Sequence, residues 1–96
     1  MSANLEPGTV LGGRYKLVRA IAAGGMAEVW LADDLSLTRK VAVKLLKAQL
    51  AQDPVVVERF RREAVAAGGL SHPNIVQVYD AIVEGDRQAV IMQYVE

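Results

Sequence analysis

The sequence contains no cysteine, few aromatic residues and no excess of either charge. The absence of cysteine excludes disulfide bonds and thiolate metal sites, and it fits a reducing compartment such as the cytoplasm. Because aromatic residues make up only 5% of the chain, we expect a core of Val, Ile, Leu and Ala. Eleven Lys and Arg residues balance eleven Asp and Glu residues. Net charge therefore gives no reason to expect a nucleic acid partner.

The sequence also lacks a long apolar run. Its longest apolar segments, 75–83 and 89–95, contain polar residues. Both are far shorter than the roughly 20 residues of a membrane-spanning helix. The first nine residues have neither a basic start nor an apolar stretch, so we expect no secretion signal. We therefore expect a cytoplasmic domain with no membrane segment. It could also be the cytoplasmic part of a membrane-anchored protein whose anchor is not visible here.

Five segments have the alternation or β-branched composition of strands: 15–23, 27–32, 40–46, 75–83 and 88–94. The glycines at 24–25 predict a hairpin between the first two segments, and Glu84-Gly85-Asp86 predicts another between the last two. In the third segment Val41, Val43 and Leu45 share one face of the strand. Ala42 and Lys44 share the opposite face.

One helix is expected over about 54–67. Asp53 is suited to cap its first turn, Pro54 is suited to the first helical position, and Gly68-Gly69 would end it. At helical spacing an apolar stripe runs through Val56, Phe60, Ala64 and Ala67. The sequence therefore predicts an α+β fold, in which one main helix packs on a five-stranded antiparallel sheet.

The glycine-rich segment Ile21–Val29 lies between two expected strands. A dinucleotide-binding fingerprint would need a helix after the glycines, and a Walker A loop would need Gly-Lys-Ser or Gly-Lys-Thr. Backbone N–H groups in such a hairpin can lie over phosphate groups, because no large side chain blocks the approach. On these residues alone, an ordinary hairpin turn is an equally good interpretation.

Two charged residues occur beside apolar faces. Lys44 taken alone is typical of a solvated strand lysine, but the small Ala42 on its face would let a flat ring pack there while the ammonium reaches a phosphate. Glu63 lies beside the apolar helical stripe, where a carboxylate is costly unless it finds a cation. Lys44 could be that cation, and a surface pair with Arg59 is the alternative. The single histidine, His72, is interpreted as a turn residue, and we predict no metal site.

Five motifs occur in register along the chain: Gly13-Arg14-Tyr15, Gly24-Gly25-Met26-Ala27-Glu28-Val29, Val41-Ala42-Val43-Lys44, Phe60-Arg61-Arg62-Glu63-Ala64 and His72-Pro73-Asn74-Ile75-Val76. Together they resemble the N-terminal lobe of bacterial eukaryotic-like (Hanks-type) serine/threonine protein kinases. The resemblance covers residues 14–96. It leaves residues 1–13 as an N-terminal extension and ends the lobe at the hinge, without the C-terminal lobe.

The resemblance implies that the glycine-rich loop covers ATP. It implies nucleotide contacts from Ile21, Ala22, Ala23, Gly24, Gly25, Met26, Ala27, Val29, Ala42, Lys44, Met92, Gln93 and Val95. In such kinases the residue at Lys44 contacts the α- and β-phosphates, and the residue at Glu63 pairs with that lysine and orients it. Met92 would occupy the gatekeeper position, while the backbone of Gln93 and Val95 would address the adenine edge.

The sequence departs from the kinase pattern in two respects. Ala22 and Ala27 replace the first and third glycines of the loop, which would cost about 1–2 kcal/mol at a positive φ and nothing in an extended backbone. The sequence also contains nothing resembling the catalytic loop or the Asp-Phe-Gly motif, which supply the catalytic base and the magnesium ligands.

We therefore expect the ATP-binding fragment of a Ser/Thr protein kinase. Magnesium would act in the complete kinase, protein substrates would bind through the missing lobe, and the fragment alone would be inactive. The alternative is a stand-alone, non-catalytic lobe that serves as a binding or dimerisation module. An N-lobe homodimer is one form of it, because the surfaces that normally face the larger lobe would be uncovered.

Overall fold

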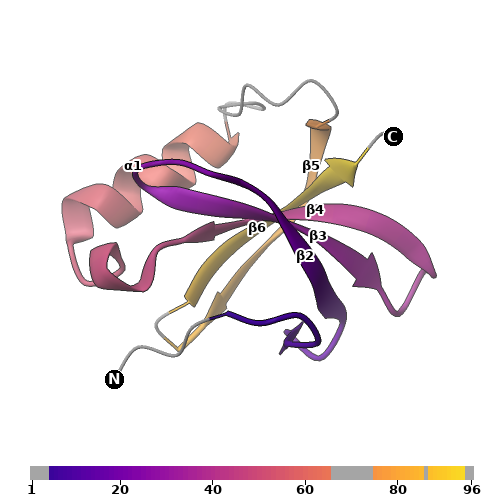
Figure 1. The fold of residues 1–96 in the computed structure, drawn as a ribbon. Coiled ribbons are helices and arrows are strands. Elements are labelled where there is room, and N and C mark those ends of the chain that lie inside the picture. Colours follow the sequence, from indigo (N-terminus) through magenta and orange to yellow (C-terminus); the bar gives the residue numbers. More distant parts are fainter. Residues whose placement is uncertain (1–4, 66–74, 86, 95–96) are drawn as a thin grey trace.

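A computed structural model describes residues 5–65, 75–85 and 87–94 of the chain. These residues form an antiparallel sheet of six strands with one α-helix beside it (Figure 1). The strands are β1 (Val10–Leu11), β2 (Tyr15–Ala23), β3 (Ala27–Asp34), β4 (Arg39–Leu46), β5 (Ile75–Glu84) and β6 (Arg87–Tyr94), and the helix is α1 (Pro54–Val65). The α+β prediction is confirmed, and a short 3-10 helix, Ala48–Leu50, precedes α1.

The strand order in the sheet is β1-β2-β3-β4-β6-β5. All five predicted strands are present, and the two predicted hairpins join β2 to β3 and β5 to β6. Gly85 follows β5 with a φ of 60°, a conformation that glycine adopts without strain. Strand β1 was not predicted, because a two-residue strand has no alternation from which it could be recognised.

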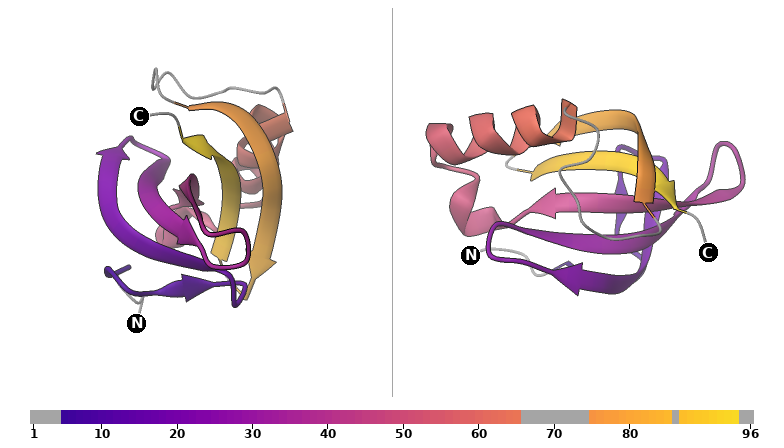
Figure 2. Two further views of the ribbon diagram at one scale, coloured as in Figure 1. Left: turned by 90° about the vertical axis from the view of Figure 1, so that its right-hand side faces the viewer. Right: turned by 90° about the horizontal axis from the view of Figure 1, so that it is seen from above.

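The sheet curls and encloses one of its faces, as Figure 2 shows. This face carries an apolar group that we call the inner cluster: Leu11, Tyr15, Leu17, Trp30, Ala32, Val41, Val43, Leu45, Ala89 and Ile91. The alternation of β4 is confirmed, since its odd-numbered apolar residues lie in the inner cluster and Ala42 and Leu46 lie in the other one. That second group, the helix-side cluster, comprises Ala27, Val29, Ala42, Leu46, Phe60, Val90 and Met92.

Helix α1 begins as its sequence predicts. A carboxylate oxygen of Asp53 accepts a hydrogen bond from the N–H of Val55 at 3.0 Å, so Asp53 caps the helix and Pro54 is its first residue. Phe60 is fully buried in the helix-side cluster, against which Val56 also packs. The Ala64 side chain, Ala67 and the expected end of the helix at 68–69 lie outside the described residues.

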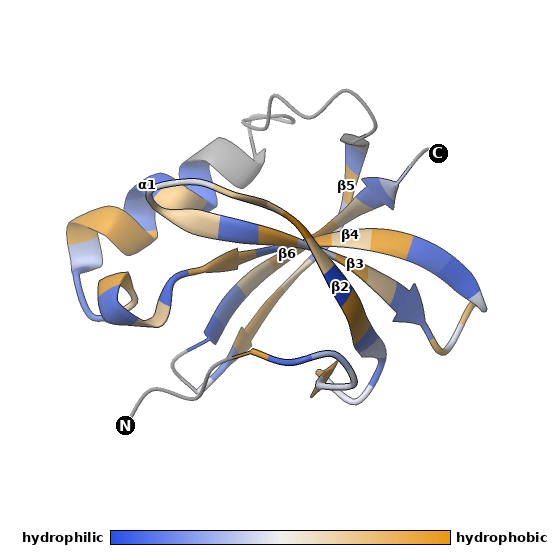
Figure 3. Cartoon of the chain, in the orientation of Figure 1, coloured by the Kyte–Doolittle hydropathy of each residue, from blue (hydrophilic) through white to orange (hydrophobic). Residues whose placement is uncertain are grey.

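The two ends of the sheet carry different features. The glycine turn between β2 and β3 lies at the same end as α1, and the β3–β4 turn lies at the opposite end (Figures 1 and 2). Hydrophilic residues begin β4 next to that second turn, whereas its centre is hydrophobic (Figure 3). Within the described part of the chain, no helix is both long and apolar enough to cross a membrane.

Candidate functional site

The helix-side cluster brings together four residues that the sequence analysis grouped. Ala42 on β4 is directly opposite Met92 on β6, and Val29 on β3 is opposite Lys44. Ile21 from β2 is half-buried and packs against the same cluster. These side chains come from four strands and meet because alternate residues of neighbouring strands share a face. The result is a continuous apolar surface with a lysine on it.

Lys44 is buried, with only 6% of its surface exposed. The interpretation of Lys44 as a solvated strand lysine is therefore wrong. Its Nζ lies 5.6 Å from the centroid of the Phe60 ring, within the range of a cation–π contact. Because a buried ammonium is costly, this environment sets Lys44 apart from the exposed Lys40 on the same strand.

The backbone of Glu63 lies in α1, three residues after Phe60. Its side chain is outside the described part of the structure. Its pairing with Lys44, and the alternative pairing with Arg59, therefore remain predictions. The other surface arginines of α1 follow the expected pattern. Arg62 is exposed and forms an ion pair with Glu58 at 3.2 Å.

The glycine turn leaves open space over the hairpin. The N–H of Gly24 donates to the carbonyl of Ala27 at 2.8 Å and closes the turn. A Cβ atom added at Gly25 would meet nothing within 4 Å. Thr38 is the only non-glycine residue with a positive φ in the described part of the chain, so Ala22 and Ala27 lie in unstrained conformations. The conformational cost considered for these two alanines therefore does not arise.

The remaining predicted contacts are distributed around this turn and along β6. Ala22 and Ala23 are exposed at the end of β2, and Met26 is half-buried. Gln93 is half-buried opposite Val41. Val95 and His72 lie outside the described residues. In the part of the chain that is described, no group of three His, Cys, Asp or Glu side chains could hold a metal ion.

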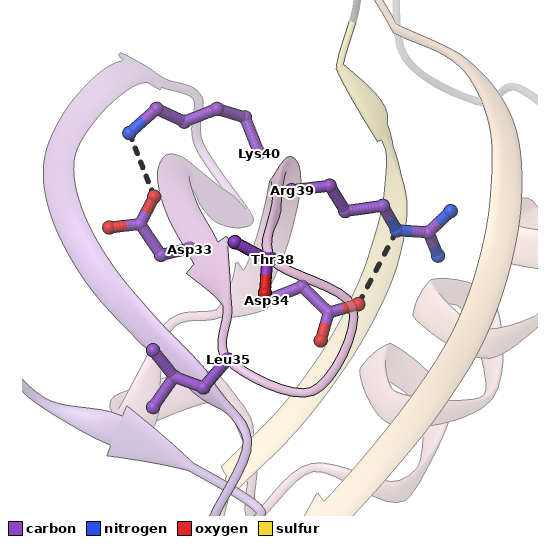
Figure 4. A pocket seen from close by; sticks show the side chains of 6 residues that line it. All are labelled: Asp33, Asp34, Leu35, Thr38, Arg39 and Lys40. Carbon is purple, nitrogen blue, oxygen red and sulfur yellow. Dashed lines mark hydrogen bonds and ion pairs between the residues drawn. The ribbon is translucent and has the colours of Figure 1, made fainter.

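A second polar constellation, at the opposite end of the sheet, was not predicted. Asp34 is completely buried at the end of β3. Arg14 donates to both of its carboxylate oxygens, from Nε at 2.8 Å and from the terminal guanidinium nitrogen at 2.9 Å. The N–H groups of Ser36 and Leu37 donate to one of the same oxygens at 3.0 and 3.1 Å. Arg39 adds a longer contact at 3.4 Å, shown with its neighbours in Figure 4.

These donors explain the ionisation of Asp34. The hydrogen bonds from Arg14, with those of the Leu37 and Ser36 backbone, hold the pKa of the carboxyl well below its ordinary value, although burial acts in the opposite direction. Asp34 thereby fastens the β3–β4 turn to the residue that precedes β2. Arg14 belongs to the motif Gly13-Arg14-Tyr15, which the sequence analysis singled out. The spacing of residues along the chain did not identify Asp34 as its partner.

Comparisons with known proteins identify the family of the chain. The family model described as protein tyrosine and serine/threonine kinase matches residues 15–96. Serine/threonine-protein kinase PrkC of Bacillus subtilis (strain 168) is 48% identical over 89 residues, which cover 93% of this chain and 14% of that protein. Serine/threonine-protein kinase PknA of Mycobacterium tuberculosis (strain ATCC 25618 / H37Rv) is 52% identical over 73 residues, which cover 76% of this chain and 17% of that protein.

Solved structures point the same way. The PknI kinase domain of Mycobacterium tuberculosis superposes with a TM-score of 0.70 at 31% identity, over 97% of this chain and 37% of that one. Another kinase domain, only 17% identical, superposes with a TM-score of 0.76 and shows the fold alone. The chain thus spans a small part of its relatives, the part that carries the sheet and a single helix. It belongs to the protein tyrosine and serine/threonine kinase family, as an N-lobe fragment related to bacterial Ser/Thr kinases.

Proposed function

We propose that this chain is the ATP-binding lobe of a kinase that transfers the γ-phosphoryl group of ATP to serine or threonine residues of proteins. The observation that carries this proposal is the burial of Lys44 on the same strand face as Ala42, within an apolar cluster at the glycine-turn end of the sheet. Residues 14–96 would form the lobe and residues 1–13 its extension. A cytoplasmic location is part of the same proposal.

The apolar residues of the site fit a flat heteroaromatic ring. Val29, Ala42 and Met92 present only aliphatic or thioether atoms, and Ile21 adds a further branched side chain from β2. Once the neighbouring side chains separate, the small Ala42 side chain would leave space for a ring, and a leucine there would fill that space. In this proposal these four residues bind the adenine base. The backbone of Gln93 and Val95 would then read its polar edge.

The polar groups of the site fit a phosphate chain. Lys44 would place its ammonium against the α- and β-phosphates, and Glu63 would keep the lysine side chain in that position. The open surface over Gly24 and Gly25 lets backbone N–H groups in the turn approach phosphate oxygens. Ala22, Ala23, Met26 and Ala27 would form the rest of this covering loop. Bound ATP supplies the phosphoryl group to be transferred.

Nucleotide entry requires the glycine hairpin to move. Ala42 has no exposed surface in this structure, and Val29 and Met92 are almost completely buried. A ring can therefore reach Ala42 only if the neighbouring side chains separate. The turn is exposed and is bonded to the segment after β4 at one point, where the Lys47 N–H donates to the Met26 carbonyl at 3.0 Å. Lifting the tip of the hairpin, residues 24–26, breaks this one hydrogen bond, whereas β3 stays paired with β4 from Ala27 to Asp34.

The remaining chemistry requires residues outside this chain. In kinases the catalytic-loop aspartate and the metal-binding aspartate and asparagine hold the acceptor hydroxyl and magnesium. None of the corresponding motifs occurs in this sequence. We therefore propose that the 96-residue chain binds ATP but transfers no phosphate, and that the larger lobe of the complete protein binds magnesium and protein substrates. A non-catalytic or dimerising lobe is the second candidate, although no observation favours it.

Titration of the purified chain with ATP tests the binding function. At a nucleotide concentration of 100 times Kd, stabilisation of about 2.7 kcal/mol is expected. For a domain of this size that corresponds to a rise in Tm of roughly 10–20 °C. Adenosine, which lacks phosphates, should bind more weakly, and incubation with labelled ATP and a protein substrate should give phosphoserine or phosphothreonine only with the complete protein. A chain that is folded by circular dichroism but unaffected by millimolar ATP would contradict the proposed role.

The substitution Gly25→Ala tests whether the turn lies over phosphates. The added methyl group meets no atom within 4 Å and the backbone needs no positive φ there, so we expect the free energy of unfolding to change by less than about 0.5 kcal/mol. ATP affinity should fall by roughly tenfold, because the methyl group hinders close approach of the phosphate chain. Adenosine affinity, measured by the same calorimetric titration, serves as the control and should be unchanged. An equal loss for both ligands would place the turn against the base instead.

A further inference from the structure

Lys44 lies between two valines on the sheet. Its neighbours across β4 are Val29 on β3 and Val90 on β6, and both are buried members of the helix-side cluster. Aliphatic side chains do not compensate a positive charge for the loss of water. Phe60, from α1, is the only aromatic residue among the buried members of the cluster. Its ring is therefore the one surface within that buried group that attracts the ammonium.

The contact between Lys44 and Phe60 is shielded from water. The Nζ atom lies 5.6 Å from the ring centroid, and both side chains are buried. Arg14 and Arg39 also lie over aromatic rings, but the side chains of these two arginines are more than a third exposed. The attraction between a cation and a ring face is strongest where water does not screen it. Among the described contacts of this type, the one at Lys44 is screened least.

Packing fixes the Phe60 ring before any ligand binds. Val56 and Val57, one helical turn earlier, pack against the same cluster as Phe60. Residues three and four apart share a helix face, so these two valines and Phe60 face the sheet together. Asp53 caps the start of this helix. A ring held in this way has a defined position, and it gives the flexible lysine side chain a defined place to settle.

A ring can hold an ammonium without neutralising it. A carboxylate takes up one of the three N–H donors of a lysine and cancels part of its charge toward a phosphate. A ring face carries no net charge, and it attracts the ammonium as a whole without an N–H donor directed at an acceptor atom. Phe60 can therefore act on Lys44 together with a carboxylate, and the lysine keeps its attraction for phosphate oxygens.

We propose that Phe60 is a positioning residue for Lys44. The face of its ring attracts the ammonium and holds it, before a nucleotide enters, at the place from which it meets the phosphate chain. Because the lysine is ordered in advance, its ordering does not reduce the affinity for ATP. The inference rests on the phosphate contact proposed for Lys44 and adds a second group that determines its position. A ring that only filled space could be exchanged for any apolar side chain of similar volume.

Fluorination of the ring tests this difference. Phe60 is the only phenylalanine in the 96-residue chain, so fluorinated phenylalanine incorporated during expression replaces residue 60 alone. Fluorine draws electrons from the ring face and weakens its attraction for a cation, while the size of the ring changes little. We expect the ratio of ATP affinity to adenosine affinity to fall by about twofold with one fluorine and by about tenfold with three. Adenosine affinity, from the same calorimetric titrations, should be unchanged.

Three substitutions separate attraction from packing. In Lys44→Met the affinity ratio should no longer depend on fluorination, because residue 44 then carries no charge. Val56→Ala removes packing from the same helix but keeps the lysine and the ring, so its ratio, and the decrease on fluorination, should match those of the unmodified chain. Phe60→Leu has an apolar side chain without a ring and should lower the ratio by about tenfold or more.

The outcomes distinguish this inference from the proposed function. A ratio unchanged by fluorination, in a chain whose preference for ATP is still lost in Lys44→Met, would overturn the role of Phe60 and leave the phosphate contact of Lys44 intact. An equal decrease on fluorination in Lys44→Met and in the unmodified chain would also overturn it, since the ring would then act through packing. If Lys44→Met kept the full preference for ATP, the phosphate contact itself would fail, and the role of Phe60 with it.

Discussion

Replacing Lys44 with methionine is expected to remove the preference of the chain for ATP over adenosine. Among the buried residues that the structure describes, Lys44 is the only cation, so its loss leaves the phosphate chain without its main attraction. In the complete kinase, phosphoryl transfer should fall by roughly 10²–10³-fold, the usual cost of removing one preorganised charged contact. Calorimetric titration with ATP and adenosine measures the first effect, and transfer of labelled phosphate measures the second.

The fold should tolerate this substitution. Methionine has nearly the length of lysine and fills the same buried space, and the carboxylate proposed to pair with Lys44 loses its cation. The Phe60 ring, now 5.6 Å from the ammonium, can pack against the thioether instead. Urea titration gives the free energy of unfolding of the variant, and nucleotide binding is measured at a temperature at which both chains are fully folded. Loss of ATP binding could then not be attributed to unfolding.

Lys40→Met is the matched control. Lys40 lies on the same strand, but its side chain is 50% exposed and pairs at the surface with Asp33. Such a pair contributes roughly 0–1 kcal/mol, and the residue lies at the opposite end of β4 from the glycine turn. ATP affinity should be unchanged. If Lys40→Met and Lys44→Met reduced ATP affinity equally, or if Lys44→Met kept the full difference between ATP and adenosine, Lys44 would not be the phosphate contact.

Much of the site could be predicted because strand periodicity carries it. The alternation along β4 placed Ala42 and Lys44 on one face and Val43 on the other, and the structure has the same division. The helix start was equally readable, since Asp53 and Pro54 act through local geometry. Strand faces and helix starts can be predicted because they depend on alternating residue types or on hydrogen bonds between residues close in the sequence.

Contacts between residues far apart in the sequence could not be predicted in this way. The burial of Lys44 depends on how α1 brings Phe60 onto the sheet, so the strand pattern alone favoured a solvated lysine. The contact between Arg14 and Asp34 joins residues 20 positions apart. Only the pairing of β2 with β3 fixes their proximity, and several other acidic residues were equally available by composition. The sequence showed an arginine before an expected strand, and nothing in it singled out Asp34 as the partner.

Asp34→Asn is expected to destabilise the lobe by about 2–3 kcal/mol. An amide has the same shape, but only one of its two polar atoms can accept, so Arg14 loses its two-oxygen contact and one amide group faces a guanidinium. The estimate lies at the lower end for buried ion pairs, because Arg14 is 35% exposed and remains partly hydrated. Tm should fall by roughly 10–20 °C for a domain of this size. Thermal unfolding followed by circular dichroism measures it.

Asp33→Asn, one residue earlier, is the control. Asp33 is 40% exposed and contacts only the exposed Lys40 among the residues drawn in Figure 4. Its substitution should change the free energy of unfolding by less than about 1 kcal/mol. Equal effects of the two substitutions would show that Asp34 contributes no more than a surface carboxylate, and that the β3–β4 turn is held by its backbone alone.

The dependence on pH separates the charge of Asp34 from its shape. Its pKa in the folded chain lies below the ordinary value of 3.8, because the protein donates hydrogen bonds to the carboxylate. The stabilisation is therefore complete above pH 3.8 and is lost as the pH falls toward the folded pKa. The difference in unfolding free energy between the unmodified chain and Asp34→Asn should be constant from pH 7 to about 5 and shrink below about pH 4. A difference that stayed constant down to pH 3 would mean that packing, and not the ionised carboxylate, stabilises the turn.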